Sequence, residues 1–179
     1  MKRTILFLSV FIVVFIIYYY NSDKKIYYLS LGDYLSYGIN NYEKIDNGYS
    51  ITIKNKYKTI LKNYVNYSTI DDYRVMDLIN DIKYNKEIKY EEKKYKIQNL
   101  LIKANLITIS IGMNDLIYKK NLNYEYADSL LNDIEDLLKL IRKYNKDKIY
   151  FLGFYNIINN SNLIEYTNKK LEKICNQNK

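Results

Sequence analysis

The sequence of 179 residues contains no histidine, no proline and no tryptophan, and it has one cysteine, Cys175. Without histidine, these residues cannot assemble a Ser-His-Asp triad or a His-ligated metal site. A single cysteine excludes internal disulfides and thiolate zinc clusters. Cys175 lies on the apolar face of a predicted helix, where we expect it to be a small buried hydrophobic residue. The sequence therefore predicts no metal ion and no cofactor.

The N-terminal segment is apolar and follows two cations, Lys2 and Arg3. Residues 5–20 carry no charge. Such a run is typical of a signal peptide or of a membrane anchor. Because no small-residue cleavage motif follows it and its last tyrosines suit a membrane interface, we predict a signal anchor and short linker over residues 1–24. The alternatives are a cleaved signal peptide and a buried core helix.

The charges indicate where the chain resides and what it meets. Lys2 and Arg3 on the inner flank favour a membrane-anchored protein with an extracytoplasmic domain, or a secreted one if the segment is cleaved. The formal net charge is +8, with 28 Lys and Arg against 20 Asp and Glu. These charges are mixed along helices and form no stripe with a stacking platform, which argues against nucleic acid. We expect attraction to an anionic membrane or wall surface instead.

The remaining residues, 25–179, show the alternation of strands and helices that is typical of an α/β domain. Apolar runs predict strands at 26–31, 65–70, 106–111 and 148–154. Helical periodicity predicts helices over 53–64, 75–82, 88–103, 127–144 and 164–175. This order requires a parallel sheet with helices on both faces. We therefore predict one three-layer α/β/α domain with a flavodoxin-like sheet, preceded by the membrane-directed helix.

Two glycine-containing motifs follow the first and third predicted strands. The first is Gly32-Asp33 within a loop that includes Ser36 and Gly38, and the second is residues 112–115 (GMND). In a flavodoxin-like sheet these strands are neighbours, and ligands bind at their carboxyl ends. The Asn114 amide can donate to an oxyanion, and the carboxylates of Asp33 and Asp115 can order the loops. Each motif alone is also ordinary turn chemistry.

These segments resemble the SGNH or GDSL hydrolases, a family of esterases, lipases and acetylhydrolases. Residues 28–38 (YLSLGDYLSYG) are similar to the family's first block, and residues 107–115 (ITISIGMND) to its third. The likeness spans roughly residues 26–175. It implies an SGNH-like fold, an acyl-ester or acetyl-ester hydrolase, and an oxyanion hole that includes Asn114. Gly32, Asp33, Ser36, Gly112 and Asp115 would then support the loops of the site.

The chain departs from the family pattern at the residues that perform the chemistry. Tyr34 occupies the position of the nucleophilic serine, and a phenol with a pKa of about 10 is a poor acyl acceptor. Ser36 is a weak substitute because its offset points it elsewhere. Residues 68–72 lack the glycine of the second block, and the final strand with its Asp-x-x-His block is missing. The expected activity of this chain is therefore little or none.

Several functions remain open at this point. The first is a membrane-anchored, outward-facing ester hydrolase by resemblance, degenerate or truncated. The second is a non-catalytic surface module that binds carbohydrate or acyl groups in the relic cleft, and the third is a fragment of a longer reading frame. The expected partners are the membrane, through residues 5–20, and an acylated carbohydrate or lipid ester. A phosphate-binding Rossmann domain fits poorly because the G-x-G-x-x-G spacing is absent.

Overall fold

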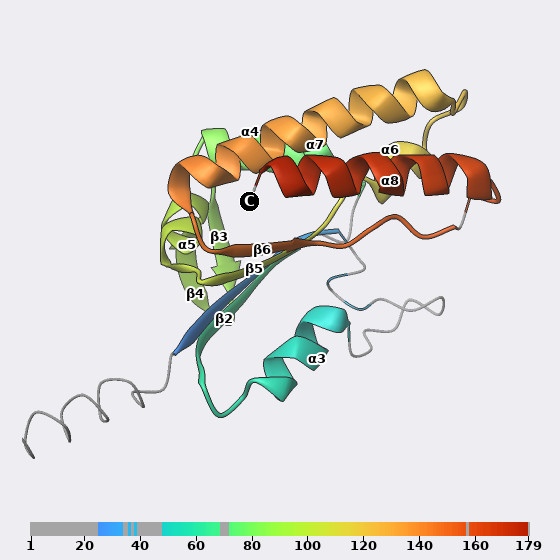
Figure 1. The fold of residues 1–179 in the computed structure, drawn as a ribbon. Helices are drawn as coiled ribbons and strands as arrows, with labels where there is room; N and C mark the ends of the chain where they lie inside the picture. Colours follow the sequence, from blue (N-terminus) through green and yellow to red (C-terminus); the bar gives the residue numbers. More distant parts are fainter. Residues whose placement is uncertain are drawn as a thin grey trace, which may run out of the picture.

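A computed structural model describes residues 25–33, 36, 38, 48–68, 72–156 and 158–178 (Figure 1). Its central sheet has four parallel strands in the order β2-β1-β5-β6. They are β1 (Ile26–Gly32), β2 (Leu61–Ser68), β5 (Leu106–Ser110) and β6 (Lys148–Phe151). The order confirms the predicted flavodoxin-like sheet, in which the first and third of these strands are neighbours.

The central strands are buried on both faces, as parallel strands covered by helices must be. In β1 the side chains of Leu29 and Leu31 are buried in the main hydrophobic core, together with Ile107 and Ile109 of β5. The register pairs Leu29 with Ile107 and Leu31 with Ile109. This face is therefore a continuous apolar layer, which holds β1 and β5 together up to their carboxyl ends.

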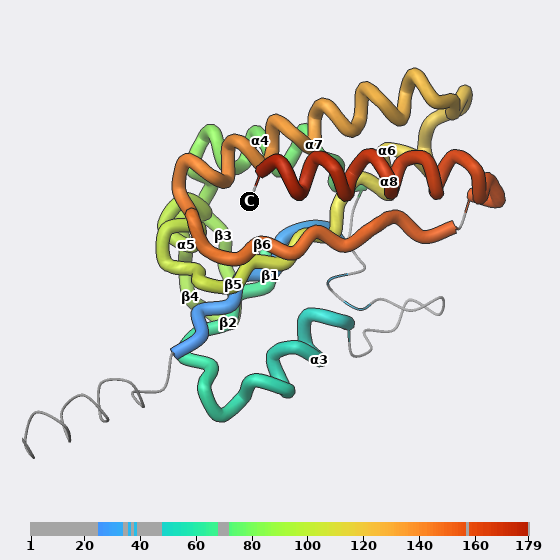
Figure 2. Tube along the Cα trace, viewed as in Figure 1, coloured from blue at the N-terminus to red at the C-terminus, as the bar shows by residue number. Residues whose placement is uncertain are grey.

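Helices cover the two faces of the sheet unequally (Figures 1 and 2). One face packs against four helices, namely α4 (Val75–Lys83), α5 (Ile97–Lys103), α7 (Tyr124–Tyr144) and α8 (Ser161–Gln177). Figure 1 shows α3 (Tyr49–Lys56) on the other face. The longest helix, α7, buries residues spaced by three and four positions, and its N-cap Asn123 accepts a hydrogen bond from the Tyr126 amide at 2.8 Å. The helices predicted at 75–82, 127–144 and 164–175 are thus confirmed.

The helix predicted over residues 53–64 is wrong. Helix α3 ends at Lys56, and β2 begins at Leu61 after a short turn. Ile53, Tyr57 and Ile60 fit a helical period, but the chain from Leu61 gains parallel pairing with β1. Tyr64 and Val65, which are adjacent and point to opposite faces of the strand, are both buried there. Burial on two faces outweighs the local helical pattern.

The helix predicted over residues 88–103 is wrong in its first half. The chain forms an antiparallel hairpin of β3 (Glu87–Tyr90) and β4 (Lys93–Lys96), and only α5 is helical. Its turn places Glu91 and Glu92 at positive φ angles of 45° and 63°. Such turns normally carry Asn or Gly, so two glutamates gave no signal. The partly buried side chains of Ile88 and Tyr95, which pair across the hairpin, pack against the core.

Three further predictions concern residues 1–24, residues 148–154 and Cys175. The predicted anchor, residues 1–24, lies outside the described residues. Among the helices that are described, none combines the length and the apolar character needed to cross a membrane. The strand predicted over 148–154 ends earlier, at Phe151. Cys175 is half-buried against the core, and this burial raises the pKa of its thiol.

Candidate functional site

The carboxyl ends of β1 and β5 meet at Gly32 and Ser110, which are partners in the strand register. Gly32 has a φ of +142°, and a β-carbon added there would lie 1.9 Å from the Ser110 carbonyl oxygen. The same oxygen accepts a hydrogen bond of 2.9 Å from the backbone amide of Asp33. Only glycine fits this close approach. The first motif is therefore held directly against the end of β5.

The second motif turns the chain away from β5 at Gly112. This residue has a φ of +100° and caps the short helix α6 (Met113–Ile117). The turn brings Asn114 into a buried position, with 3% of its surface exposed. Its side-chain Nδ2 donates a hydrogen bond of 3.0 Å to the backbone carbonyl of Tyr73. The second N–H of this amide has no partner among the described residues, so it is available to an acceptor such as an oxyanion.

The carbonyl that orients Asn114 belongs to a tyrosine that is itself fixed. The hydroxyl of Tyr73 donates to Asp81 Oδ2 at 2.7 Å, and the hydroxyl of Tyr67 donates to the same oxygen at 2.5 Å. Lys86 Nζ adds an ion pair of 3.0 Å. Burial and then the bond to the Asp81 carboxylate raise the pKa of both phenols, so both stay neutral donors. Tyr67 of β2 and Tyr73 are thus both bonded to Asp81 of α4 beside Asn114.

Asp115 neighbours Asn114 but serves the start of α4. Its Oδ2 accepts a hydrogen bond of 3.3 Å from the backbone amide of Val75, the first residue of that helix. Burial raises the pKa of this carboxyl to about 6, although the Val75 amide and the charge of Arg74 oppose the shift. Asp115 therefore links α6 to the start of α4.

Asp33 and Ser36 form the buried base of the first loop. Asp33 Oδ1 accepts a hydrogen bond of 3.3 Å from the hydroxyl of Ser110. The Ser36 hydroxyl donates to the Asp33 carbonyl at 2.8 Å, and the Ser36 carbonyl accepts from Ser50 Oγ at 2.5 Å. Ser36 is fully buried. Its hydroxyl is engaged within the loop, which fits a supporting role. Tyr34, at the nucleophile position, lies outside the described residues.

The structure also contains a buried hydroxyl network that the sequence analysis missed. It lies between α3 and the sheet, where Tyr28 OH and Thr108 Oγ1 are 2.8 Å apart and Ser30 Oγ lies 3.2 Å from Tyr49 OH. Burial is the main cause that raises the pKa of Tyr28 and Tyr49, so both stay protonated at neutral pH. The signal was in the sequence, since Tyr28 and Ser30 alternate with the two core leucines of β1.

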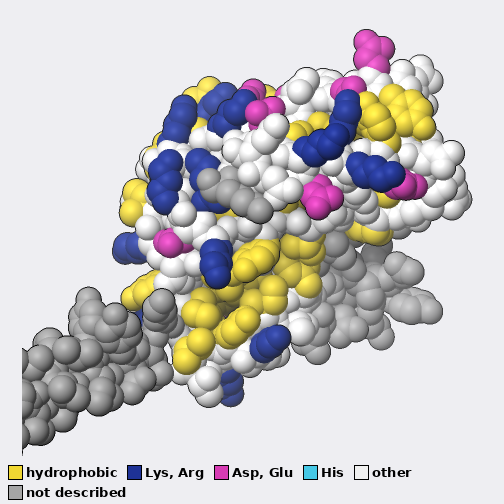
Figure 3. Space-filling view, in the orientation of Figure 1, with side chains coloured by type: hydrophobic (Ala, Val, Ile, Leu, Met, Phe, Trp, Pro, Cys, Tyr) yellow, Lys and Arg dark blue, Asp and Glu magenta, His cyan; other side chains and the backbone are white. Residues whose placement is uncertain are grey.

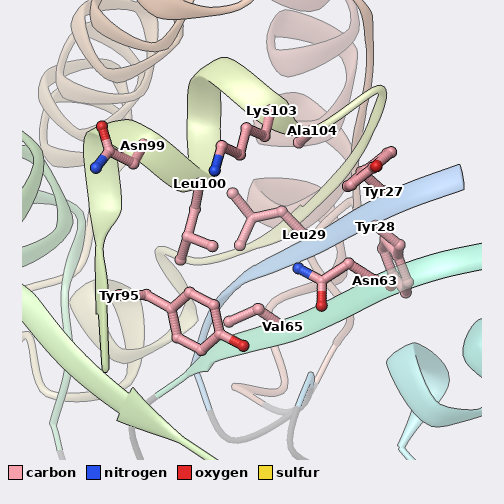
Figure 4. Close-up of a pocket in the computed structure, with 10 residues that line it drawn as sticks. All are labelled: Tyr27, Tyr28, Leu29, Asn63, Val65, Tyr95, Asn99, Leu100, Lys103 and Ala104. Carbon is pink, nitrogen blue, oxygen red and sulfur yellow. The ribbon is translucent and has the colours of Figure 1, made fainter. Parts of the chain in front are cut away.

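A cavity of about 150 Å³ lies elsewhere in the molecule (Figure 4). It is bounded by β1, β2, β4 and α5, with apolar walls that include Leu29, Val65 and Leu100. Tyr95 and Lys103 supply polar groups at its edge. Its strand residues lie in the amino half of β1 and around the middle of β2, and Asn114 is not among its lining residues, so the cavity is separate from Asn114. It is therefore not part of the site at the carboxyl ends.

Chemically, the described site offers an amide donor to an oxyanion, beside the buried carboxyl groups of Asp33 and Asp115. The amide of Asn114 is an oriented donor, while the nearby tyrosines are phenols whose pKa is raised. The 179 residues contain no imidazole. Among the described residues there is also no group of three or more Cys, Asp or Glu side chains that could hold a metal ion. The geometry defines an α/β protein with a donor site at its strand ends.

Comparisons with known proteins agree with this description of the fold. No protein-family model matches the sequence, and no curated protein matches it. Solved structures do match. The psychrotrophic esterase EstA from Pseudoalteromonas sp. is 14% identical with a TM-score of 0.59, and the match covers 84% of this chain and 72% of that one. A lipase from a goat rumen metagenome is 18% identical with a TM-score of 0.54, over 84% and 74%.

A third similar structure is a putative lipolytic protein of the G-D-S-L family from Desulfitobacterium hafniense. It is 12% identical with a TM-score of 0.55, and the match covers 84% of this chain and 71% of that one. These similarities show that the chain has the fold of the GDSL or SGNH hydrolases, in a divergent form. They confirm the resemblance drawn from residues 28–38 and 107–115.

Proposed function

We propose that this chain is an SGNH-type ester-binding protein that keeps the oxyanion-binding half of an ester hydrolase site and has little or no turnover of its own. The observation that carries the proposal is the position of Asn114. Its amide is buried beyond the carboxyl end of β5, is oriented by the Tyr73 carbonyl, and has a second N–H with no partner among the described residues. The similar solved structures include esterases and lipases, which supports an acyl or acetyl ester as the ligand class.

The low turnover follows from residues that the sequence lacks. Tyr34 stands where the family resemblance places the nucleophilic serine, and the 179 residues contain no histidine. Loss of a catalytic triad lowers the rate by orders of magnitude, whereas one oxyanion donor contributes about 2.7–4 kcal/mol. Tyr34 and the absence of histidine also favour the alternative function, a non-catalytic surface module that binds acylated carbohydrate or acyl groups.

We further propose that the chain is held at the membrane by residues 1–24, with the remaining domain facing outward. The support is the uncharged run of residues 5–20 behind Lys2 and Arg3. A cleaved segment would give a secreted domain instead. Flotation of the full chain with phospholipid vesicles, together with N-terminal sequencing of the mature protein, distinguishes these two forms.

Titration with monoethylphosphonate, the tetrahedral phosphorus compound that inhibits EstA, tests the ester-binding proposal. Binding is followed by ¹⁵N nuclear magnetic resonance of the side-chain amides in the full chain in detergent. We expect saturable shifts of the Asn114 amide and binding at least about tenfold weaker in Asn114→Asp. The matched variant Asn132→Asp, on the exposed face of α7, should bind as the wild type does. Equal binding by all three proteins would overturn the proposal.

A further inference from the structure

Positive charge is concentrated at one edge of the sheet. Because the four strands are parallel, the segments that lead into them all lie at the end of the sheet where the strands begin, here called the amino edge. These segments are residue 25 and residues 56–62, 103–106 and 142–148. Their charged residues are Lys25, Lys56, Lys58, Lys62, Lys103, Arg142, Lys143, Lys146, Asp147 and Lys148. Asp147 is the one acid among them, so the amino edge is strongly cationic.

The opposite edge, where the candidate site lies, has no such bias. The described connections that follow the strands carry three acids and three cations, which are Asp33, Asp72, Arg74, Asp115, Lys119 and Lys120. Charge is therefore segregated along the strand direction. A cationic surface of this kind attracts anionic partners and repels another copy of itself.

The amino edge also has an apolar groove of about 580 Å³. Ile26, Leu106 and Tyr150 of the sheet line it together with Tyr57 and Ile60 of the turn after α3. Tyr150 is 53% exposed. Figure 3 shows hydrophobic side chains gathered over the sheet between the upper helices and α3, with Lys or Arg side chains beside them. The surface is thus aromatic and apolar in its centre.

Cations surround this groove. Lys25 and Lys148 line it directly, together with the acid Asp147. A second hollow of about 450 Å³ shares Asp147, Lys148 and Tyr150 with the groove and adds two cations, Arg142 and Lys146. Tyrosine and lysine side chains both place an apolar body in a membrane interface and a polar end in water. The combination fits the boundary between lipid headgroups and acyl chains.

We propose that the amino edge docks on the surface of an anionic lipid bilayer, with Tyr57 and Tyr150 in the interface and the surrounding lysines among the headgroups. The attraction of each lysine to such a surface decays within a Debye length of about 10 Å. A second copy is a poorer occupant because two cationic grooves repel. The docking does not depend on ester binding at Asn114.

The course of the chain supports the same orientation. Lys25 starts β1 at the amino edge, and residues 21–24 separate it from the uncharged run 5–20. Four residues span at most about 14 Å, so a run held in a bilayer would keep this edge close to the headgroups. The site around Asn114, at the opposite ends of the strands, then faces away from the membrane.

Lysine acetylation of the full chain in vesicles tests the docking. The chain is reconstituted in phosphatidylcholine alone or with 30% phosphatidylglycerol, treated with a water-soluble acetylating reagent and read by mass spectrometry. We expect Lys58, Lys146 and Lys148 to react about fivefold more slowly in the anionic vesicles, and Lys119 and Lys120 equally in both. The protection should disappear in 0.5 M salt.

Matched charge reversals complete the test. Lys146→Glu/Lys148→Glu should abolish the protection of Lys58, whereas Lys119→Glu/Lys120→Glu should leave it intact. Equal acetylation of the edge lysines in both lipids overturns the docking while leaving the anchor proposal standing, since an inserted anchor holds the chain on both vesicles. Protection that persists in detergent and grows with protein concentration overturns it in favour of self-association. A chain that floats with neither vesicle overturns both proposals.

Discussion

Gly32 and Ser110 approach so closely that a β-carbon on Gly32 would lie 1.9 Å from the Ser110 carbonyl oxygen. This contact joins the two central strands at their carboxyl ends and sets the first loop beside the turn that carries Asn114. The candidate site therefore depends on a backbone contact between residues 78 positions apart in the chain. A residue with a β-carbon therefore does not fit at position 32.

Gly32→Ala is expected to be strongly destabilising. The added methyl group meets backbone, and the φ of +142° is unfavourable for alanine, so we expect a loss of about 3 kcal/mol or more in the free energy of unfolding. Gly153→Ala is the matched control, because its β-carbon would meet only the Asn168 side chain, at 3.0 Å. That change should cost less than about 1 kcal/mol. Urea unfolding of the full chains in detergent measures both, and equal losses would refute the account of Gly32.

Asp115→Asn should remove a pH dependence of stability. Burial raises the pKa of Asp115 from 3.8 to about 6, so between these values the folded state binds a proton that the unfolded state has released. The stabilisation is fully present below pH 3.8 and is lost as the pH rises through 6, an effect of about 3 kcal/mol. Asparagine can still accept from the Val75 amide. The variant should thus gain stability over the wild type as the pH rises from 4 to 7 in thermal unfolding. A constant difference would contradict the burial of a charged Asp115.

Asp81→Ala should destabilise the segment that orients Asn114. It leaves the buried hydroxyls of Tyr67 and Tyr73 without their acceptor, and each unsatisfied group costs about 1–3 kcal/mol. Asp136→Ala, at an exposed position of α7, should change stability by less than about 0.5 kcal/mol. The Asn114 amide resonance should also shift in Asp81→Ala but remain in place in the control. An unshifted resonance would show that Asp81 does not position the site.

Tyr34→Ser restores the residue type that the family resemblance places at the nucleophile position. We expect no gain in hydrolysis of p-nitrophenyl acetate, because the chain contains no histidine to take the serine proton. The assay compares the initial rates of variant and wild type with the rate in the same buffer and detergent. A large gain would mean that another group in this chain acts as the base.

The spacing of apolar residues was sufficient to predict β1, β5 and α7. The core strands β1 and β5 and the amphipathic helix α7 each match their predicted ranges closely, because one pattern of apolar residues dominates each. The two errors in the predicted helices have different causes, a long-range strand pairing for β2 and an unusual turn for the hairpin. Strand β2 is stabilised by β1, and the β3–β4 hairpin turns at Glu91 and Glu92 without a glycine or asparagine. The pairing of β2 with β1 is not visible in a local window of sequence, and the hairpin lacks the turn residues that would reveal it there.

The site was predicted only in part, because some of its contacts join residues that are distant in the sequence. Glycines at matching strand ends implied that Gly32 and Gly112 lie near each other, and the topology places them on neighbouring strands. The partner of Asn114 could not be predicted, since it is the backbone carbonyl of Tyr73, at a position with no sequence signature. The role of Asp115 at the start of α4 likewise depends on how α4 packs beside β5.

Ester turnover by the purified full chain tests the central claim most directly. The claim is that Asn114 provides an oxyanion donor in a chain that lacks the nucleophile and base needed for hydrolysis. The account predicts that wild-type protein hydrolyses p-nitrophenyl butyrate no faster than buffer with the same detergent. A rate clearly above that background which disappears in Asn114→Asp would contradict it, because the described site would then be catalytic.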